Sequence, residues 1–383
     1  MPVLERLRVS PGPLPSPTAP SKAQSAPLRA RQPRLQHQQV VLRGLSRPSS
    51  ADLFDWLFSG GLAHPSGGVA GWRERRTGRL SDEYPEISGY FLSAAVFADA
   101  TGNAAVIRAA DWLCARIEAN ASASRRVDGS AIYNFDQGII AAGLIKYGVR
   151  AGNARAVAAG IRAASRLRDQ VSELGHLPTL DPAAGMPDGR PATWSTVGRL
   201  HLAKTVQCLL LAAELGVAGM REAARDIIDD VSTAFSLASD GLRNEAGQIN
   251  LHATCYALEG LWIWDAANRT TSLHEILHSA LDEIVSYRLP SGGFPRLASA
   301  ASREQSDVHA QVVRLASVLG RGSTVGSSIA RLRQVASPAE FGWSVPYEPQ
   351  APEVHENAWA TMFAAQALAL VDGPPDLDWW ELI

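Results

Sequence analysis

A repeated pair of helix-forming segments constrains the fold of this chain more than any other feature. Two stretches share a helix of small apolar residues, a Gly-Asn turn and a second helix: "YFLSAAVFADATGNAAVIRAADWLCARI" and "IIAAGLIKYGVRAGNARAVAAGIRAASRL". Their turns, Gly102-Asn103 and Gly152-Asn153, lie fifty positions apart. Glycine often follows a helix in the left-handed conformation, and asparagine is a favoured N-cap. Each stretch is therefore predicted to form a helical hairpin, with both glycines at equivalent C-cap positions of positive φ.

The same unit recurs to the end of the chain. Further hairpins are predicted from "GRLHLAKTVQCLLLAAELG" with "MREAARDIIDDVSTAF", "INLHATCYALEGLWIWDAA" with "SLHEILHSALDEIVSYRL", and "SDVHAQVVRLASVLG" with "VGSSIARLRQVAS". A sixth begins at "ENAWATMFAAQALAL", and either the C-terminal "DLDWWELI" or the early "ADLFDWLFSG" is expected to complete it. Hairpins that cannot bury both faces alone stack on their neighbours, and about six close into a ring. We therefore predict an all-α fold, an (α/α)6 toroid in one domain over residues 51–383.

Composition separates two layers of helices within this ring. The first helix of each hairpin is almost entirely small and apolar, as in "IIAAGLIKYG" and "QCLLLAAELG", whereas the second carries more charge, as in "MREAARDIIDD". Helices that are apolar all round are buried. The first helices are therefore predicted to form the inner layer and the second helices the outer layer.

Residues 1–50 differ from the rest of the chain. They hold eight Lys and Arg residues against the single acidic Glu5, and they are rich in Pro, Ser and Gln. Such a composition cannot fill a core and predicts a disordered tail. Nucleic-acid binding by this tail is disfavoured because no aromatic residue interleaves its arginines before Phe54. A dispensable extension is the favoured interpretation.

The remaining composition is typical of a globular protein. The chain has 383 residues, of which 46% are hydrophobic, enough to bury a large core. No apolar run reaches the roughly 18 residues of a membrane span, and the N-terminus lacks the apolar core of a secretory signal. We therefore expect a cytoplasmic protein. Cys114, Cys208 and Cys255 are widely spaced in apolar stretches, which predicts reduced core residues and neither disulfides nor a zinc site.

A cluster of polar and aromatic residues stands at the start of each predicted inner helix. In chain order the clusters are Asp82, Glu83, Tyr84 and Glu86; Tyr133, Asn134 and Asp136; Trp194, Arg199 and His201; Asn250, His252 and Tyr256; Ser306, Asp307, His309 and Gln311; and His355, Glu356, Asn357 and Trp359. Inner helices of such a ring run in the same direction, so the clusters should meet at one end. A pocket with converging titratable groups is the default hypothesis for an active site.

Each of these residues also has an ordinary structural explanation. Glu86 and Asp136 lie in first helical turns, where the helix dipole favours a carboxylate by roughly 0.3–1 kcal/mol. A single buried histidine is usually a hydrogen-bonded core residue, and the aromatic side chains could simply plug the centre of the toroid. Repetition favours function, because capping does not explain a histidine and an aromatic ring beside a carboxylate at so many helix starts. Trp262, Trp264, Trp379 and Trp380 are interpreted as packing residues.

Several segments make the sequence resemble known toroids. The segments are "YPEISGYF", "YNFDQGIIAAGL", "LHATCYALEGLW", "GGFPR", "SDVHAQVVRLASVL" and "NAWATMFAAQALAL". Over roughly residues 80–371 the chain looks like the six-hairpin glycosidase and terpenoid-cyclase-like toroids, and most closely like polysaccharide biosynthesis proteins of the VpsJ type. The resemblance implies a carbohydrate-related role, but such toroids include hydrolases, lyases, epimerases and cyclases, so it leaves the reaction open.

Two kinds of carbohydrate chemistry fit these residues. In a glycoside hydrolase, Glu86 and Asp136 would be the acid and the nucleophile or base, with Asp307 in reserve. In a uronate lyase or epimerase, Tyr256 or His252 would abstract a proton, and a basic side chain would neutralise the substrate carboxylate. The hydrolase is slightly favoured. The residues expected to bind the saccharide are Tyr84, Tyr133, Trp194, Arg199, His201, His309, Gln311, Asn357 and Trp359, with Arg199 as the basic side chain.

Other functions rank lower. A terpene cyclase would use the aromatic lining to stabilise a carbocation, but the chain lacks the aspartate-rich "DxDD" stretch of such enzymes, and Asp307 alone would have to be the acid. A binding scaffold would not need converging acids and histidines. No metal is expected, because the histidines fall on different predicted helices, and the absence of a P-loop or a dinucleotide fingerprint predicts no organic cofactor.

Overall fold

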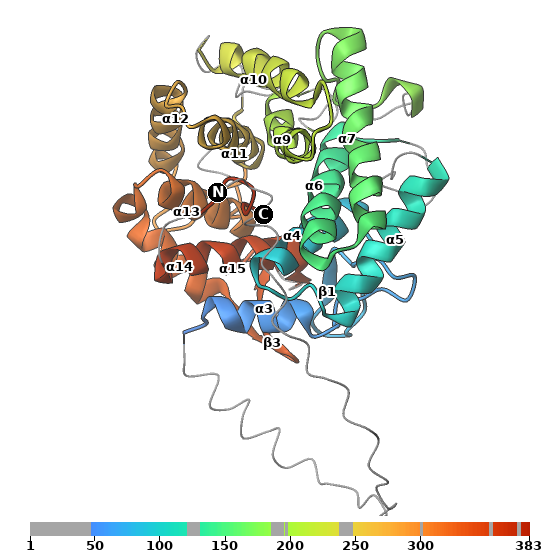
Figure 1. The fold of residues 1–383 in the computed structure, drawn as a ribbon. Coiled ribbons are helices and arrows are strands. Elements are labelled where there is room, and N and C mark those ends of the chain that lie inside the picture. Colours follow the sequence, from blue (N-terminus) through green and yellow to red (C-terminus); the bar gives the residue numbers. More distant parts are fainter. Residues whose placement is uncertain are drawn as a thin grey trace, which may run out of the picture.

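The computed structural model consists of paired helices arranged in a ring (Figure 1). It describes residues 47–120, 131–184, 195, 198–236, 248–298, 302–351, 355–373 and 377–383. In chain order the pairs are α4 (Pro85–Phe97) with α5 (Ala104–Asn120), α6 (Asn134–Ala151) with α7 (Ala154–Leu174), η2 (Leu200–Thr205) and α9 (Val206–Glu214) with α10 (Met220–Ser236), α11 (Leu251–Asn268) with α12 (His274–Ser286), and α13 (Ser306–Val318) with η4 (Gly322–Val325) and α14 (Gly326–Val335). One further short helix, η1, spans Pro182–Ala184.

The sixth pair joins the two ends of the chain. Helix α15 (Ala358–Asp372) packs against α3 (Ser50–Phe58), and it also contacts α13 and α4, which closes the ring. Of the two segments expected to complete this pair, the early helix is therefore the one that does so. The fold is the all-α (α/α)6 toroid that the repeat predicted.

Helix α3 begins just before the predicted domain boundary. Ser49 caps it by accepting a hydrogen bond from the backbone N–H of Asp52 at 3.3 Å, and Asp52 Oδ2 accepts one from the Ser49 N–H at 2.9 Å. The Ser50 hydroxyl donates to the carbonyl of Ala365 on α15 at 2.8 Å. Residues 1–46 of the predicted tail lie outside the described residues.

Burial separates the two layers as expected. Every residue of α4 from Pro85 to Val96 is buried except Glu86, and α6 is buried continuously from Asn134 to Gly148. The outer helix α7 buries only one stripe of residues, which face the inner layer. Small residues allow the inner helices to cross closely: a Cβ on Gly143 would lie 2.2 Å from the carbonyl oxygen of Gly89 on α4. Larger side chains at this crossing would push α4 and α6 apart.

The two Gly-Asn turns are only partly equivalent. Gly152 ends α6 in the left-handed conformation with φ 67°. Asn153 Oδ1 accepts from the Ala156 N–H at 3.0 Å, and Asn103 Oδ1 accepts from the Ala105 N–H at 2.8 Å. At the first turn, however, the residue with positive φ is Asp99, at 55°, and not Gly102. The prediction for Gly102 was wrong because α4 ends earlier, so the left-handed residue comes three positions before the glycine.

A small sheet lies between the first and last parts of the chain. Strands β1 (Trp72–Glu74), β4 (His355–Asn357), β3 (Gly342–Pro346) and β2 (Ser337–Ala339) follow one another in this order across the sheet, and all pairings are antiparallel. Trp72 and Val345 both pair with Asn357. The sheet therefore joins the segment before α4 to the segment before α15, beside the place where the ring closes.

Residues 377–383, called the C-terminal segment below, lie inside the ring (Figure 1). Trp379 and Trp380 are buried, and so are Leu382 and Ile383. The three cysteines are buried and form no disulfide. Across the described residues, no helix is both long enough and apolar enough to cross a membrane.

Candidate active-site pocket

A pocket of about 880 Å³ opens where the inner helices begin. Residues at the start of α4, α6, η2, α11 and α15 line it, together with the loop and strand that precede α4. The described lining residues are Gly71, Trp72, Glu74, Arg79, Leu80, Ser81, Asp82, Glu83, Tyr84, Glu86, Ile87, Tyr133, Phe135, Asp136, Ser195, His201, His252, Tyr256, Tyr347 and Trp359. The N-terminal ends of the inner helices thus meet at one end of the ring.

Two carboxylates face this pocket from adjacent inner helices. Glu86 lies in the first turn of α4 and Asp136 in the first turn of α6. Tyr84 and Tyr133 precede them as N-cap residues whose side chains make no capping hydrogen bond, and both tyrosines also line the pocket. Asp136 is 5% exposed, whereas Glu86 is only partly buried. The helix dipoles of α4 and α6 favour negative charge at these two positions.

Asp307 and Gln311 lie behind the part of the pocket wall that α11 and α15 form, and they contact side chains that line it. His252 Nδ1 lies 2.8 Å from Gln311 Oε1 and 3.3 Å from Asp307 Oδ2. Trp359 Nε1 donates to the same Asp307 oxygen at 3.3 Å. The tautomer of His252 with its proton on Nδ1 matches these two acceptor oxygens. Asp307 is fully buried and does not line the pocket, so it orients two lining side chains and does not itself reach a ligand.

The pocket floor holds ionisable groups in their neutral forms. Burial and, to a smaller extent, the nearby His252 together lower the pKa of His201 to about 3. Burial, assisted by the charges of Tyr90 and Glu86, holds the pKa of the Tyr256 phenol well above its usual range. Tyr90, stacked on Tyr256 with ring centroids 6.4 Å apart, has a pKa raised by burial and by Glu86. At neutral pH these groups donate or accept hydrogen bonds without carrying charge.

Aromatic rings make up much of the remaining wall. Trp72 is 38% exposed and stacks on His355 with ring centroids 5.6 Å apart. Phe135 lies 4.6 Å from Tyr256 between ring centroids, and Tyr347 meets Trp359 edge-on at 5.2 Å. Trp72, Phe135 and Tyr347 were not among the residues predicted from the sequence. Trp72 and Tyr347 lie outside the inner helices, so the helical repeat gives no signal for them.

Five of the predicted site residues do not line the pocket, and one lies outside the described residues; Asp307, which stands behind His252, is the first of the five. Arg199 is at the surface, where its Nη1 lies 3.5 Å from Asp230 Oδ2 of α10. His309 points away toward Glu304, at 3.4 Å, and burial lowers its pKa to about 4. Asn357 caps α15 through the Ala360 N–H at 2.8 Å. Gln311 is buried behind His252. Trp194 is the residue outside the described part.

A repeated stripe of side chains runs from the pocket into the ring. Four inner helices place residues at positions i, i+4 and i+7 on one face, toward the ring axis. The sets are Glu86, Tyr90 and Ser93 on α4; His252, Tyr256 and Glu259 on α11; Asp307, Gln311 and Arg314 on α13; and Trp359, Phe363 and Gln366 on α15. The sequence predicted the first member of each set. It predicted none of the third members, Ser93, Glu259, Arg314 and Gln366, which lie about one turn beyond the second members.

Acidic side chains dominate the charge of the described lining. Glu74, Asp82 and Glu83 join the two first-turn carboxylates, and Arg79 is the one Lys or Arg residue among the described lining positions. Arg79 Nε lies 3.9 Å from Glu74 Oε2 and its side chain is 83% exposed. The pocket therefore presents negative potential to an entering ligand. Among the described residues, no group of three or more His, Cys, Asp or Glu side chains could hold a metal ion.

Comparison with solved structures identifies the same fold in several enzymes. The unsaturated glucuronyl hydrolase of Bacillus sp. GL1, responsible for the degradation of glycosaminoglycan, gives a TM-score of 0.65 at 12% identity, covering 90% of this chain and 99% of its own. An alpha-amylase from Clostridium perfringens gives a TM-score of 0.61 at 12% identity, and the match covers 85% of this chain and 99% of the amylase. A mutant unsaturated glucuronyl hydrolase from Streptococcus agalactiae, complexed with dGlcA-GalNAc6S, gives a TM-score of 0.59 at 10% identity. This match covers 92% of this chain and 98% of the hydrolase.

No protein-family model matches the chain, and no curated protein matches it. At these identities the structural similarity establishes a shared (α/α)6 toroid fold and nothing finer.

Proposed function

We propose that this protein is a glycoside hydrolase whose catalytic carboxylates are Glu86 and Asp136. The observation that carries this proposal is the meeting of these two side chains, from adjacent inner helices, in one aromatic-lined pocket. Glycoside hydrolysis uses such a pair, in which one carboxyl group protonates the leaving oxygen and the other attacks the sugar or activates water. Solved proteins of the same fold, described as a glucuronyl hydrolase and an alpha-amylase, support this class of reaction.

The surrounding residues have supporting roles in this proposal. Trp72 and Tyr347 offer apolar faces on which a sugar ring can stack. His252 and Tyr256 donate or accept hydrogen bonds at the pocket floor, and Asp307 positions the His252 ring. Hydrogen bonds to substrate hydroxyls would fix the scissile bond beside the two carboxylates, which supplies much of the catalysis through orientation.

Hydrolysis is favoured over uronate lyase or epimerase chemistry. A lyase needs a base, and the raised pKa of Tyr256 keeps this phenol protonated near neutral pH. It also needs a cation beside the substrate carboxylate, and Arg199, the expected cation, contacts Asp230 at the surface. The terpene-cyclase alternative relied on Asp307 as its acid. That carboxylate lies behind His252 and Trp359, away from the described lining, so the geometry gives this alternative no support.

The charge of the pocket favours an uncharged saccharide. A uronic acid would bring its carboxylate close to Glu86 and Asp136, with only Arg79 among the described lining residues to offset five carboxylates. Like charges gathered in one pocket repel one another. A neutral poly- or oligosaccharide avoids this cost. A place in polysaccharide metabolism or biosynthesis, of the VpsJ kind that the sequence resembles, is part of the same proposal.

Conservative substitutions of the two carboxylates test the proposal. The activity of Glu86→Gln and Asp136→Asn is measured on a panel of neutral glycosides, matching glucuronides and oligosaccharides, alongside the melting temperature. We expect at least one neutral substrate to be hydrolysed in preference to its glucuronide. Both variants should lose roughly 10²-fold or more in rate with the melting temperature changed by only a few degrees, because the amides keep the shape and lose the proton.

Glu222→Gln provides the matched control. Glu222 is also a carboxylate in a first helical turn, on the outer helix α10, so its substitution repeats the effect on a helix dipole without touching the pocket. It should retain full activity. Stable and fully active Glu86→Gln and Asp136→Asn proteins would rule out the two-carboxylate mechanism.

A further inference from the structure

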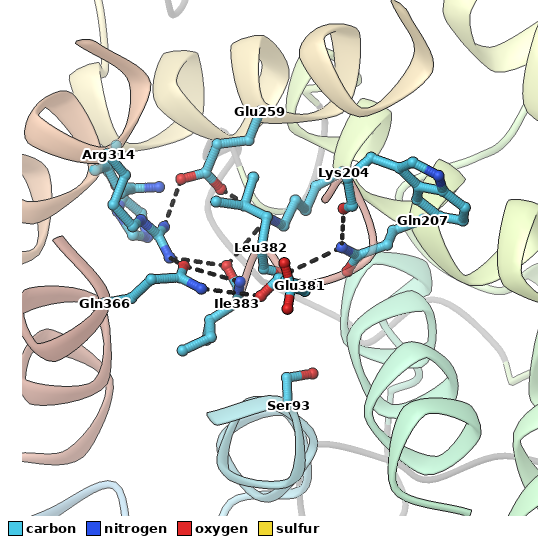
Figure 2. Close-up of polar contacts among 12 residues, drawn as sticks. Ser93, Lys204, Gln207, Glu259, Arg314, Gln366, Glu381, Leu382 and Ile383 are labelled. Carbon is cyan, nitrogen blue, oxygen red and sulfur yellow. Dashed lines mark hydrogen bonds and ion pairs between the residues drawn. The ribbon is translucent and has the colours of Figure 1, made fainter. Parts of the chain in front are cut away.

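A layer of buried charged side chains lies beneath the pocket floor and takes no part in the proposed chemistry. We call it the ionic layer, and it consists of Lys146 on α6, Lys204 on η2, Glu259 on α11 and Arg314 on α13. Figure 2 shows the last three of these residues around the C-terminal segment. Each of these residues is at most 1% exposed. On α11, Glu259 lies seven residues beyond the pocket residue His252, which corresponds to about 10 Å along a helix. The ionic layer is therefore separate from the pocket.

The ionic layer binds the backbone of the C-terminal segment. Lys146 Nζ donates to the carbonyl of Leu382 at 3.0 Å. Lys204 Nζ and Arg314 Nη1 donate to the carbonyl of Ile383 at 3.1 and 2.9 Å. Figure 2 shows Lys204 and Arg314 reaching the segment from different inner helices.

Two glutamines extend the same recognition. Gln207 Nε2 donates to the carbonyls of Trp379 and Leu382, both at 2.9 Å. Gln366 Nε2 donates to the carbonyl of Glu381 at 2.9 Å, and Gln366 Oε1 accepts from the Ile383 N–H at 3.0 Å. Side chains that bind successive backbone groups of a segment without helix or strand structure are typical of peptide recognition.

The segment supplies hydrogen-bond acceptors that the buried cations need. Glu259 contacts both Lys204, at 3.0 Å, and Arg314, so its carboxylate is shared between two cations. Burial lowers the pKa of Lys204 to about 8, and burial together with the charge of Lys204 lowers that of Lys146 well below its usual range. Buried donors without acceptors are strongly destabilising. The carbonyls of the C-terminal segment therefore complete this layer.

Contacts continue from the ionic layer to the pocket floor. The guanidinium of Arg314, which holds the Ile383 carbonyl, lies 4.2 Å from the ring centroid of Phe363. Phe363 meets the ring of Tyr256 edge-on with centroids 6.3 Å apart, and Tyr256 lines the pocket. Tyr256 and Glu259 also share one face of α11. The segment, the ionic layer and the pocket floor thus form consecutive packed layers.

We propose that the ionic layer is a peptide-binding site whose ligand is the chain's own segment 377–383, and that the bound segment positions Tyr256 at the pocket floor. The segment contains no helix or strand and is held mainly by side chains of the ring. Its docking is therefore a binding event that can be weakened without changing the ring itself. This proposal does not depend on the reaction that the pocket carries out.

Lysine reactivity gives a direct test in the full-length protein. The sequence contains three lysines, Lys22, Lys146 and Lys204, so two of the three lysine amines lie in the ionic layer. The full chain is treated with acetic anhydride, and acetylation at each lysine is followed by mass spectrometry. Trp380→Ala removes a buried anchor of the segment, since Trp380 is 5% exposed. Leu277→Ala, which removes a buried side chain from the outer helix α12, is the control for a general loss of stability.

We expect Trp380→Ala to raise acetylation of Lys146 and Lys204 at least 10-fold over the wild type, and more than Leu277→Ala does at an equal loss in melting temperature. Adding a synthetic peptide with the sequence of residues 377–383 should suppress the extra labelling. Amide hydrogen exchange in residues 251–259 should rise in Trp380→Ala and fall again with the peptide, because Tyr256 lies there.

Two outcomes would overturn the proposal. Equal labelling of Trp380→Ala and Leu277→Ala, or labelling that the peptide does not reduce, would show that the layer is not a peptide site. Labelling that responds to the peptide while exchange in residues 251–259 stays constant would refute the link to the pocket floor. If Trp380→Ala does not fold, Gln207→Leu removes two carbonyl contacts while keeping the side-chain size, and the same measurements apply.

Discussion

Two neighbouring residues of α13 show how position around a helix decides the role of a side chain. Asp307 and His309 are two residues apart, which separates them by about 200° around the helix axis. Asp307 consequently contacts His252 at the pocket wall, whereas His309 faces Glu304 on the other side. His201, in contrast, reaches the pocket from η2. His201 and His309 are both neutral in the folded protein, since burial lowers their pKa values to about 3 and about 4.

Neutral buried histidines make stability depend on pH. The pKa of His201 is about 3 in the folded state, against 6.5 for the unperturbed side chain. Between these values the unfolded chain binds the extra proton, so stability falls as the pH drops below about 6.5, by up to about 1.4 kcal/mol per pH unit. We expect His201→Gln to lose about 2 kcal/mol less than the wild type between pH 7 and pH 5 in urea unfolding.

His274→Gln, which alters an exposed histidine of α12, serves as the control for this measurement. If His201→Gln and the wild type lose the same free energy of unfolding between the two pH values, His201 is not held neutral by burial.

Part of the candidate site could be predicted at this scale. Clusters at helix starts predicted that Glu86, Asp136 and Tyr256 would gather in one place, and the geometry brings them to one pocket. The direction in which a side chain leaves the helix start could not be predicted. Arg199, at the N-cap of η2, turns outward to Asp230 on α10, a partner that only the tertiary fold supplies.

At the level of elements, the helical pairs follow from local rules and the strands do not. Apolar periodicity and turn residues predicted the hairpins because both signals lie within each segment. The strands contain three to five residues, and β1 pairs with a strand far along the sequence, as Trp72 does with Asn357. No local pattern distinguishes such short strands from loop.

The two Gly-Asn turns give a matched pair of substitutions. Gly152 has φ 67° and open space where a Cβ would lie, so Gly152→Ala adds backbone strain and no clash. Gly102 is equally open but does not have positive φ. We expect Gly152→Ala to lower the free energy of unfolding by roughly 1 kcal/mol, and Gly102→Ala to change it far less. Chemical denaturation of both variants checks this, and equal effects would contradict a left-handed turn at Gly152 alone.

For the whole molecule, the position where the folded ring begins matters for truncation. Residues 1–46 have a composition that cannot form a core, whereas Ser49 caps α3 and Ser50 ties it to α15. Deleting residues 2–46 should leave the melting temperature within a few degrees of the full chain. Extending the deletion to residue 50 should cost about 1 kcal/mol or more through the lost cap. Thermal melts of the two truncations decide this, and a large loss on deleting only residues 2–46 would give the tail a structural role.

Closure of the ring depends on both ends of the chain. Helix α3 comes early in the sequence and α15 late, yet they form one pair, so the sixth unit can form only after nearly the whole chain is available. Contacts between such distant segments slow folding, because the chain between them loses conformational entropy before the contacts can form. The repeat predicted the number of units, but only the tertiary structure shows which terminal segment completes the ring and which enters it.

The C-terminal segment also decides how molecules can travel through the toroid. Its carbonyls bind Lys146, Lys204 and Arg314, one layer beyond Tyr256 at the pocket floor, so within the described part of the chain the pocket is closed at this end. A polymer cannot be threaded through the ring and drawn along it, and only a stretch near a free chain end or a flexible loop can reach the floor. Whatever enters must back out through the same opening. A molecule bound at the floor therefore obstructs the entry of the next one.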